Sequence, residues 1–263
     1  MNWFEAIILG LVQGFTEFLP VSSSGHLELG KYLFNINPEA NFYFTVAVHG
    51  ATVLSTIAVL WKEIADLFKG FFKFRLNEET KYVIKIFISM IPAGIVGLYL
   101  TDVIDKYFTG NMVSLGIQFL ITAVLLVLPS FIKPKERPIG YFDSFIIGIA
   151  QAIAVVPAIS RSGATIATGM MLGNNKADIA KFSFLMVLIP VIGANLVEFK
   201  SGNFTAEGTS MPVILAGFIT AFISGYFACK WMIKIVKRGN LLWFAAYCVL
   251  IGIFSIFLGL HVI

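Results

Sequence analysis

Six long apolar runs divide this chain and restrict the folds that are open to it. A helix needs about 20 apolar residues to cross the hydrocarbon core of a bilayer, and each run is close to that length. Charged residues make up only 13% of the chain, well below the share of roughly a quarter that soluble domains carry. The sequence therefore predicts an all-α polytopic membrane protein. The six expected transmembrane helices cover residues 41–61, 83–100, 113–132, 181–197, 212–230 and 241–262.

Two pairs of shorter apolar segments complete the chain. The first pair covers residues 4–19 and 24–35, and the second covers 141–156 and 162–173. Segments shorter than a full span are typical of re-entrant limbs, which enter the membrane and turn back. Proline ends a helix by removing a backbone donor, so Pro20 is expected to stop the first limb. We therefore expect two re-entrant helical hairpins in addition to the six spans.

The second half of the chain repeats the first. Gly10-Leu11-Val12-Gln13 aligns with Gly148-Ile149-Ala150-Gln151, and Ser22-Ser23-Ser24-Gly25 aligns with Ser160-Arg161-Ser162-Gly163. Each half then holds one hairpin and three crossings, and three is odd. The halves, residues 1–135 and 136–263 of one membrane domain, are thus expected to form an inverted repeat. Its two polar turns would approach each other from opposite faces near the midplane.

The distribution of basic residues predicts the orientation. Of the 19 Lys and Arg residues, fifteen lie in loops or span ends on one expected side, three lie on the other, and Arg161 lies at the second turn. Cations collect on the cytoplasmic side of membrane proteins. Both termini are therefore expected outside, with the site reached from the outer face. This bias also accounts for the net charge of +4 without a nucleic-acid partner.

A polar stretch from Gln13 to His26 interrupts the first hairpin. It places one carboxylate, three serine hydroxyls and an imidazole between apolar flanks, and ionisable groups at membrane depth usually serve function. A helix that begins among the serines would offer free N–H groups to a phosphate. Gln13 and Glu17 are four residues apart, so they would share one helix face.

Arg161 is the corresponding feature of the second turn. A guanidinium stays charged, so at membrane depth it needs an anionic partner, either Glu17 or a phosphate that it binds bidentately. Ser160 and Ser162 flank it at the start of another expected helix, whose N-terminus would point to the same place. Gly163 and Gly25 would allow close backbone approach. His49 and His261 lie singly on apolar spans and are interpreted as structural, although His49 is placed where it can point into the cavity.

These two stretches resemble the signatures of a known family. The run Gln-Gly-Phe-Thr-Glu-Phe-Leu-Pro-Val-Ser-Ser-Ser-Gly-His at 13–26 is similar to the first signature of the undecaprenyl-diphosphate phosphatases, the bacitracin-resistance family. Pro-Ala-Ile-Ser-Arg-Ser-Gly at 157–163 resembles the second. The family usually has Glu at position 13, Gly at position 158 and an apolar residue at position 28. The resemblance in length and hydropathy spans the whole chain.

The resemblance implies an enzyme of the bacterial cytoplasmic (inner) membrane. Such an enzyme hydrolyses undecaprenyl diphosphate to undecaprenyl phosphate and inorganic phosphate, which recycles the lipid carrier of cell-wall peptidoglycan synthesis and confers resistance to bacitracin. The expected partners are therefore the polyprenyl diphosphate substrate and membrane lipids. A homo-oligomer is compatible with the sequence, which does not specify the number of copies.

We assign roles to the polar residues on this basis. Ser23 is the nucleophile, chosen mainly because it matches the family's reactive serine. His26 is the base that takes its proton or the group that activates water, and direct attack by His26 stays open. Glu17 orients His26 or binds a divalent cation, Mg²⁺ or Ca²⁺. Arg161 neutralises phosphoryl charge. The other candidates are assigned to substrate binding: Gln13, Ser22, Ser24, Gly25, Ser160, Ser162 and Gly163.

A transporter or flippase for a polyprenyl phosphate or another anionic amphiphile is the main alternative. An inverted repeat with two re-entrant hairpins suits alternating access as well as it suits catalysis. A nucleophile next to a base discriminates the two classes, because a transporter does not need one. Ser23 and His26 are expected to supply such a pair, which favours the enzyme.

Overall fold

The computed structural model describes residues 1–36, 42–108, 110–133, 135–201 and 209–261. Every regular element within these ranges is a helix, which confirms the all-α prediction. Six of the described helices are long and apolar enough to cross a membrane, as the polytopic prediction requires. They are α3 (Phe42–Val59), α5 (Glu78–Tyr99), α7 (Met112–Val127) with its 3-10 extension η2 (Leu128–Phe131), α10 (Lys176–Ser201), α11 (Met211–Arg238) and α12 (Leu242–His261).

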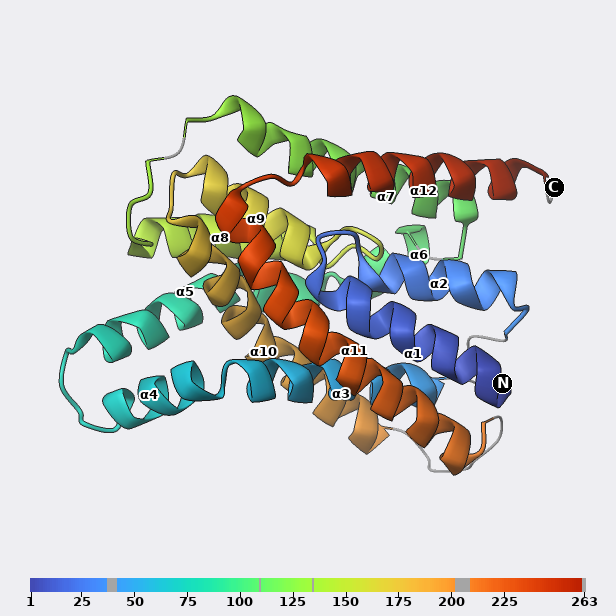
Figure 1. Ribbon diagram of the computed structural model, residues 1–263, viewed down its shortest axis with the longest axis horizontal. Helices are drawn as coiled ribbons and strands as arrows, with labels where there is room; N and C mark the ends of the chain where they lie inside the picture. The colour runs from blue at the N-terminus through green and yellow to red at the C-terminus, as the bar shows by residue number, and fades with distance from the viewer. Residues whose placement is uncertain (37–41, 109, 134, 202–208, 262–263) are drawn as a thin grey trace.

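Two pairs of shorter helices form the hairpins. The first pair is α1 (Trp3–Phe18) and α2 (Ser23–Leu33), and the second is α8 (Tyr141–Ile153) and α9 (Arg161–Met171). In Figure 1 the hairpins enter from opposite ends of the molecule, and their turns meet near its middle. This is the arrangement that an inverted repeat produces, while the division at residues 135 and 136 stays a prediction.

Small residues bring each hairpin against the second long span of the other half. α1 packs most closely against α11, where a Cβ added to Gly10 would lie 2.5 Å from the carbonyl oxygen of Gly217. α8 packs against α5, where a Cβ on Gly148 would collide with the carbonyl oxygen of Ser89. Helices in lipid associate through such close van der Waals contacts. Because Gly10 and Gly148 are aligned positions, both hairpins are held in an equivalent way.

The expected spans leave residues 62–82 as a connection, and the first part of this connection is a further helix, α4 (Trp61–Phe71). Ile64 and Leu67 of α4 pack against the main hydrophobic core, so the charged residues occupy the other faces of an amphipathic helix. A second short helix, α6 (Thr101–Phe108), connects α5 to α7.

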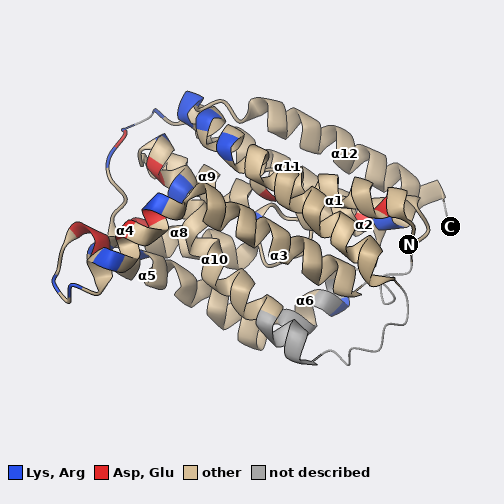
Figure 2. Ribbon diagram, turned by 60° about the horizontal axis from the view of Figure 1, so that its bottom comes forward, with Lys and Arg blue, Asp and Glu red and all other residues tan. Residues whose placement is uncertain are grey.

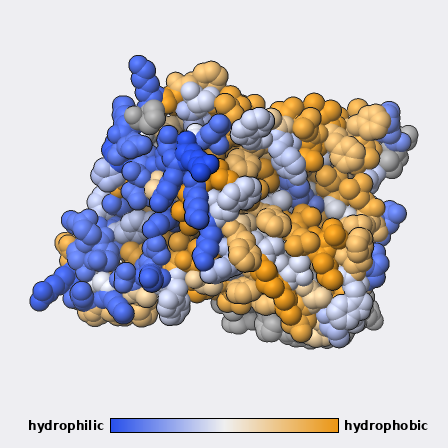
Figure 3. All heavy atoms as spheres, in the orientation of Figure 1, coloured by the Kyte–Doolittle hydropathy of each residue, from blue (hydrophilic) through white to orange (hydrophobic). Residues whose placement is uncertain are grey.

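Charged residues gather at one end of the molecule (Figure 2). That end holds α4, the turn that follows it and the C-terminal end of α11, and it is the hydrophilic region on the left of Figure 3. Hydrophobic surface covers much of the rest of the face drawn there, as expected for helices that contact lipid. The two ends therefore differ in charge as the sequence predicted. Which end faces the outside of the cell stays a prediction.

Candidate active site

Both hairpin turns start a helix with a serine cap. The Ser22 hydroxyl accepts a hydrogen bond from the Gly25 amide at 3.2 Å, and the aligned Ser160 hydroxyl accepts one from the Gly163 amide at 3.0 Å. The N-termini of α2 and α9 are thus fixed, and each presents the positive end of a helix dipole. Residues 22–24 and 160–162 line one common cavity, so both N-termini contribute to the same site.

The two turns are also bonded to each other. The Ala158 amide donates to the Ser24 hydroxyl at 3.2 Å, and the Ser162 hydroxyl donates to the Leu19 carbonyl at 3.2 Å. Ala158 has a φ of 62°, in the left-handed region that favours glycine. This conformation explains why the family that the sequence resembles usually has glycine at this position. Gly25 packs closely there too, because a Cβ on it would lie 2.9 Å from the Cβ of Ala158.

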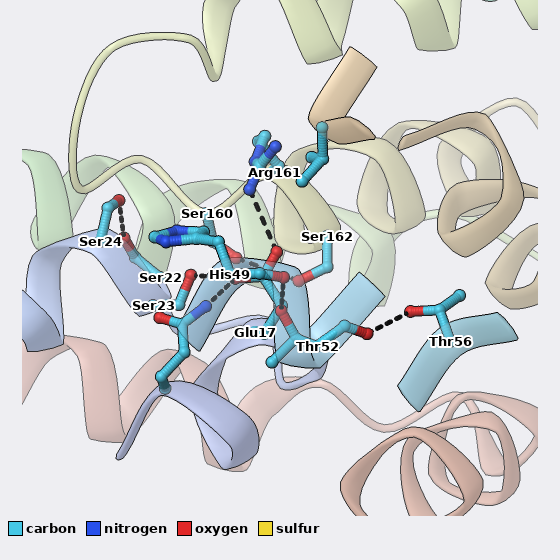
Figure 4. Close-up of polar contacts among 12 residues, drawn as sticks. Glu17, Ser22, Ser23, Ser24, His49, Thr52, Thr56, Ser160, Arg161 and Ser162 are labelled. Carbon is cyan, nitrogen blue, oxygen red and sulfur yellow. Dashed lines mark hydrogen bonds and ion pairs between the residues drawn. The ribbon is translucent and has the colours of Figure 1, made fainter. Parts of the chain in front are cut away.

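Glu17 is the centre of the hydrogen-bond network (Figure 4). Its Oε2 accepts a hydrogen bond from the Ser23 hydroxyl at 2.6 Å and another from Nε2 of Gln13 at 2.9 Å. Its Oε1 accepts one from Nη2 of Arg161 at 3.1 Å. The Glu17 side chain is 14% exposed and that of Arg161 is 31% exposed. The carboxylate is therefore oriented by three donors, of which Arg161 comes from the other half of the chain.

His26 lies outside this network. Its Nδ1 is 2.6 Å from the Ser22 carbonyl oxygen, which can only accept, so Nδ1 carries a proton. Its Nε2 is 2.8 Å from the Tyr247 hydroxyl on α12, and its ring packs edge-on against Phe119 of α7. In the neutral tautomer Nδ1 therefore donates to the Ser22 carbonyl and Nε2 accepts from the Tyr247 hydroxyl, so neither ring nitrogen is free. The sequence placed His26 next to the Ser23 hydroxyl, but in the structure that hydroxyl bonds to Glu17.

His49 of α3 is a second histidine to consider at this site. Figure 4 shows it beside Glu17 and the serines of the first turn, and it interacts electrostatically with Glu17. Its Nδ1 is 2.8 Å from the Thr45 carbonyl oxygen, so Nδ1 donates and Nε2 is left as the basic nitrogen. The interpretation of His49 as purely structural therefore misses its place beside the carboxylate.

Both polar and apolar side chains line the cavity. The polar part adds several hydroxyls and one carboxamide to the groups above: Thr16, Thr52, Thr56, Gln151, Thr165 and Ser183. The apolar part is lined by Phe18, Val53, Ile159, Phe184, Val187, Leu188 and Val191. An amphiphile with an anionic head and an apolar tail matches this division.

Few groups here can bind a divalent cation. Glu17 is the one carboxylate among the described residues that line the cavity, and no three His, Cys, Asp or Glu side chains form a metal-binding group anywhere in the described ranges. Oε1 of Gln13 is buried and has no hydrogen-bond partner within these ranges. A carboxylate and a neutral oxygen suit Mg²⁺, which also takes phosphate oxygens and water, better than Ca²⁺, which needs about six to eight oxygens.

Most residues predicted to form the site are brought together. Glu17, Ser23 and Arg161 meet in one network, and the other serines of both turns line the cavity. Gly25 and Gly163 contribute through the capping amides. His26 is set apart, and Glu28, where the family usually has an apolar residue, pairs with Lys31 at 3.4 Å. The threonines and Gln151 were not predicted as site residues, although the alignment of Gln151 with Gln13 was a usable signal.

The fold and the site together define an all-α polytopic membrane protein in which the turns of two helical hairpins meet at one polar cavity. The family described as bacitracin resistance protein BacA matches residues 6–254. The chain belongs to this family. It is 53% identical over 260 residues to an undecaprenyl-diphosphatase of Parabacteroides distasonis, covering 97% of this chain and 98% of the relative. A protein of the same name from Bacteroides fragilis is 52% identical with the same coverage, and one from Methanosphaera stadtmanae is 39% identical over 277 residues, covering 98% of this chain and 99% of the relative.

Proposed function

We propose that this protein hydrolyses undecaprenyl diphosphate to undecaprenyl phosphate and inorganic phosphate. Relatives that are about half identical over nearly the whole chain carry the name of this activity. One observation in the site carries the proposal: the Ser23 hydroxyl donates a 2.6 Å hydrogen bond to Glu17. A hydroxyl bonded to a carboxylate beside two helix N-termini is an activated nucleophile, which favours the phosphatase over the transporter.

The chemistry takes two steps. Ser23 Oγ attacks the terminal phosphorus while its proton passes to Glu17. The new bond is Oγ–P, the bond that breaks joins the terminal phosphorus to the bridging oxygen, and the leaving group is undecaprenyl phosphate. Water then attacks the phosphoserine, which releases inorganic phosphate and restores the hydroxyl. Arg161 and the amides at the starts of α2 and α9 stabilise the charge on the phosphoryl oxygens.

Arg161 must exchange partners during this cycle. In the structure it donates to Glu17 at 3.1 Å, and a phosphate offers it a bidentate partner of higher charge. When Arg161 moves to the phosphate, the Glu17 carboxylate loses a neighbouring positive charge and becomes a better base. Substrate binding therefore activates Glu17.

His26 acts in this proposal as a positioning residue. It donates to the Ser22 carbonyl at 2.6 Å and bonds to Tyr247 at 2.8 Å, so it ties the first turn to α12. The earlier assignments of His26 as base or nucleophile stay predictions. They require its ring to leave one of these partners.

A bound Mg²⁺ would add positive charge to neutralise the diphosphate. Glu17 and Oε1 of Gln13 would hold it, together with substrate oxygens and water. Gln13→Glu would add a second carboxylate and should shift the cation titration of activity to lower concentration. An unchanged midpoint would exclude Gln13 from the metal site, and an inactive parent rescued by Gln13→Glu would contradict the proposed activity.

The finer localisation is also part of the proposal. We place the protein in the bacterial cytoplasmic membrane with both termini outside and the site reached from the outer face, as the charge distribution favours.

Phosphate release from undecaprenyl diphosphate in detergent tests the function directly. The purified parent should release one phosphate per lipid and leave the lipid monophosphate, and Ser23→Ala should not. Translocation of intact lipid from one leaflet of a vesicle to the other, without phosphate production, would instead show that the protein is a transporter.

A further inference from the structure

Gln151 is a buried polar residue without a role in the proposed mechanism. It lies in the last turn of α8, on the second hairpin, and is only 3% exposed. It nevertheless lines the same cavity as Glu17, Ser23 and Arg161. Among the described residues no hydrogen bond involves its carboxamide. Some fully enclosed side-chain oxygens and nitrogens in these ranges also lack a partner, but those of Gln151 do not belong to that set, so they are not fully enclosed. Its polar atoms therefore retain access to the cavity.

A buried amide without a partner is costly, because it gives up its bonds to water. Gln118 of α7 is a buried glutamine whose donors do have partners. It is 2% exposed, and its Nε2 donates to the Phe108 carbonyl and to the Ser114 hydroxyl, each at 3.0 Å, while its buried Oε1 has no partner among the described residues. A buried glutamine that has no such partner but lines a cavity is available to a ligand.

The repeat explains why Gln151 is unpaired. Gln151 aligns with Gln13, whose Nε2 donates to Glu17 one helical turn further on at 2.9 Å. The residue one turn after Gln151 is Val155, whose side chain cannot accept a hydrogen bond. The second half thus keeps the amide but not its internal acceptor. The donors of Gln151 are therefore free for an acceptor that arrives from outside the protein.

The charge balance of the cavity indicates what that acceptor is. Glu17 and Arg161 are the charged groups among its described lining residues, and they already form an ion pair. A diphosphate brings several negative charges and many acceptor oxygens, and Arg161 alone cannot satisfy them. Neutral N–H donors must complete its coordination.

We propose that Gln151 is a substrate-binding residue whose amide donates to a non-bridging oxygen of the diphosphate. This inference rests on the proposed function for the identity of the lipid. The donors themselves indicate an anionic group with several acceptor oxygens. Gln151 would hold the group from the second half of the chain while Ser23 approaches it from the first half.

The test compares Gln151→Leu and Gln151→Glu with the matched control Gln118→Leu. A lost neutral hydrogen bond should raise KM for undecaprenyl diphosphate about fivefold with kcat nearly unchanged. Gln151→Glu keeps the shape but places a carboxylate against the phosphate. Its KM should rise further at pH 8 and recover toward pH 5 as the carboxyl is protonated, a pH profile that a purely structural role would not give. Gln118→Leu should leave KM at the parent value.

Inorganic pyrophosphate provides a readout that is independent of turnover. The parent and Gln118→Leu should be stabilised against thermal unfolding at the same pyrophosphate concentration, and Gln151→Leu should need about five times more. If the parent binds pyrophosphate but does not hydrolyse the lipid, the proposed function fails while the role of Gln151 still stands. If both Gln151 variants keep the parent KM and the parent pyrophosphate response, Gln151 does not bind the diphosphate.

Discussion

Glu17→Gln tests the catalytic assignment most directly. The carboxamide has nearly the same shape, so its oxygen can still accept from Ser23 and Gln13 in place of Oε2, which now accepts at 2.6 and 2.9 Å. It cannot take a proton. Its NH₂ group would face Arg161 in place of Oε1, and two donors do not attract each other. The variant therefore removes the base and frees the guanidinium, with little change in packing.

The expected magnitude follows from these contacts. Loss of a general base lowers the rate by about 10²–10⁴-fold, or about 3–5 kcal/mol of transition-state stabilisation. KM should stay level or fall, because Arg161 no longer has to leave a carboxylate to reach the phosphate. Ser23→Ala combined with Glu17→Gln should be no slower than Ser23→Ala alone, because the two side chains act as a unit.

Phosphate release from undecaprenyl diphosphate at saturating substrate provides the measurement, and Tyr247→Phe provides the control. The Tyr247 hydroxyl is 2.8 Å from Nε2 of His26, so this change frees the ring nitrogen but leaves Glu17 in place. We expect it to cost less than about tenfold in kcat, as loss of one neutral hydrogen bond would. If Glu17→Gln stays within tenfold of the parent while His26→Gln is inactive, the base is His26 and our reasoning is wrong.

Three further predictions concern charge. Arg161→Lys should lower kcat/KM at least about 100-fold, because an ammonium cannot replace a bidentate fork; turnover within a few-fold of the parent would exclude Arg161 as the phosphate clamp. In intact cells a cysteine at Asn111 should react with an impermeant maleimide and one at Lys73 should not, because the basic end is expected inside; labelling at Lys73 would reverse the orientation. The hydrogen bond from Lys181, 2.6 Å away, lowers the pKa of Glu63 below 4.5. Glu63→Gln should therefore cost up to about 1 kcal/mol in thermal unfolding at pH 7, and the difference should disappear as the pH falls through the lowered pKa; a difference that does not shrink as the carboxyl becomes protonated would exclude the ion pair as its cause.

The spans were predictable because membrane crossing depends on length and apolarity within one segment. The described helices begin and end within a few residues of most predicted runs. The same criterion failed to predict α4, because charged residues lower the mean hydropathy of this segment. Its Ile64 and Leu67 nevertheless pack against the core. Amphipathic periodicity, rather than mean hydropathy, would have found it.

The sequence allowed the site to be located at the two hairpin turns, but it did not predict which side chains contact each other there. His26 lies three residues after Ser23, so proximity in sequence favoured a pair between them. The orientation of the ring is instead fixed by Phe119 and Tyr247, which are far away in sequence. Ser23 meets Glu17 because the hairpin closes around Pro20. Such contacts depend on tertiary packing, which short motifs do not contain.

The two halves have diverged in a way that favours an enzyme over a carrier. At aligned positions the first half has Ser23 and the second has Arg161. One turn after the aligned glutamines the first half has Glu17 and the second has Val155. The nucleophile and its carboxylate therefore come from one hairpin, and the permanent positive charge comes from the other. Alternating access needs a site that opens to each side in turn, and a nucleophile on one hairpin opposite a cation on the other does not contribute to that opening. Phosphoryl transfer does gain, because the attacking oxygen and the charge that stabilises the phosphoryl group must approach the phosphorus from different directions.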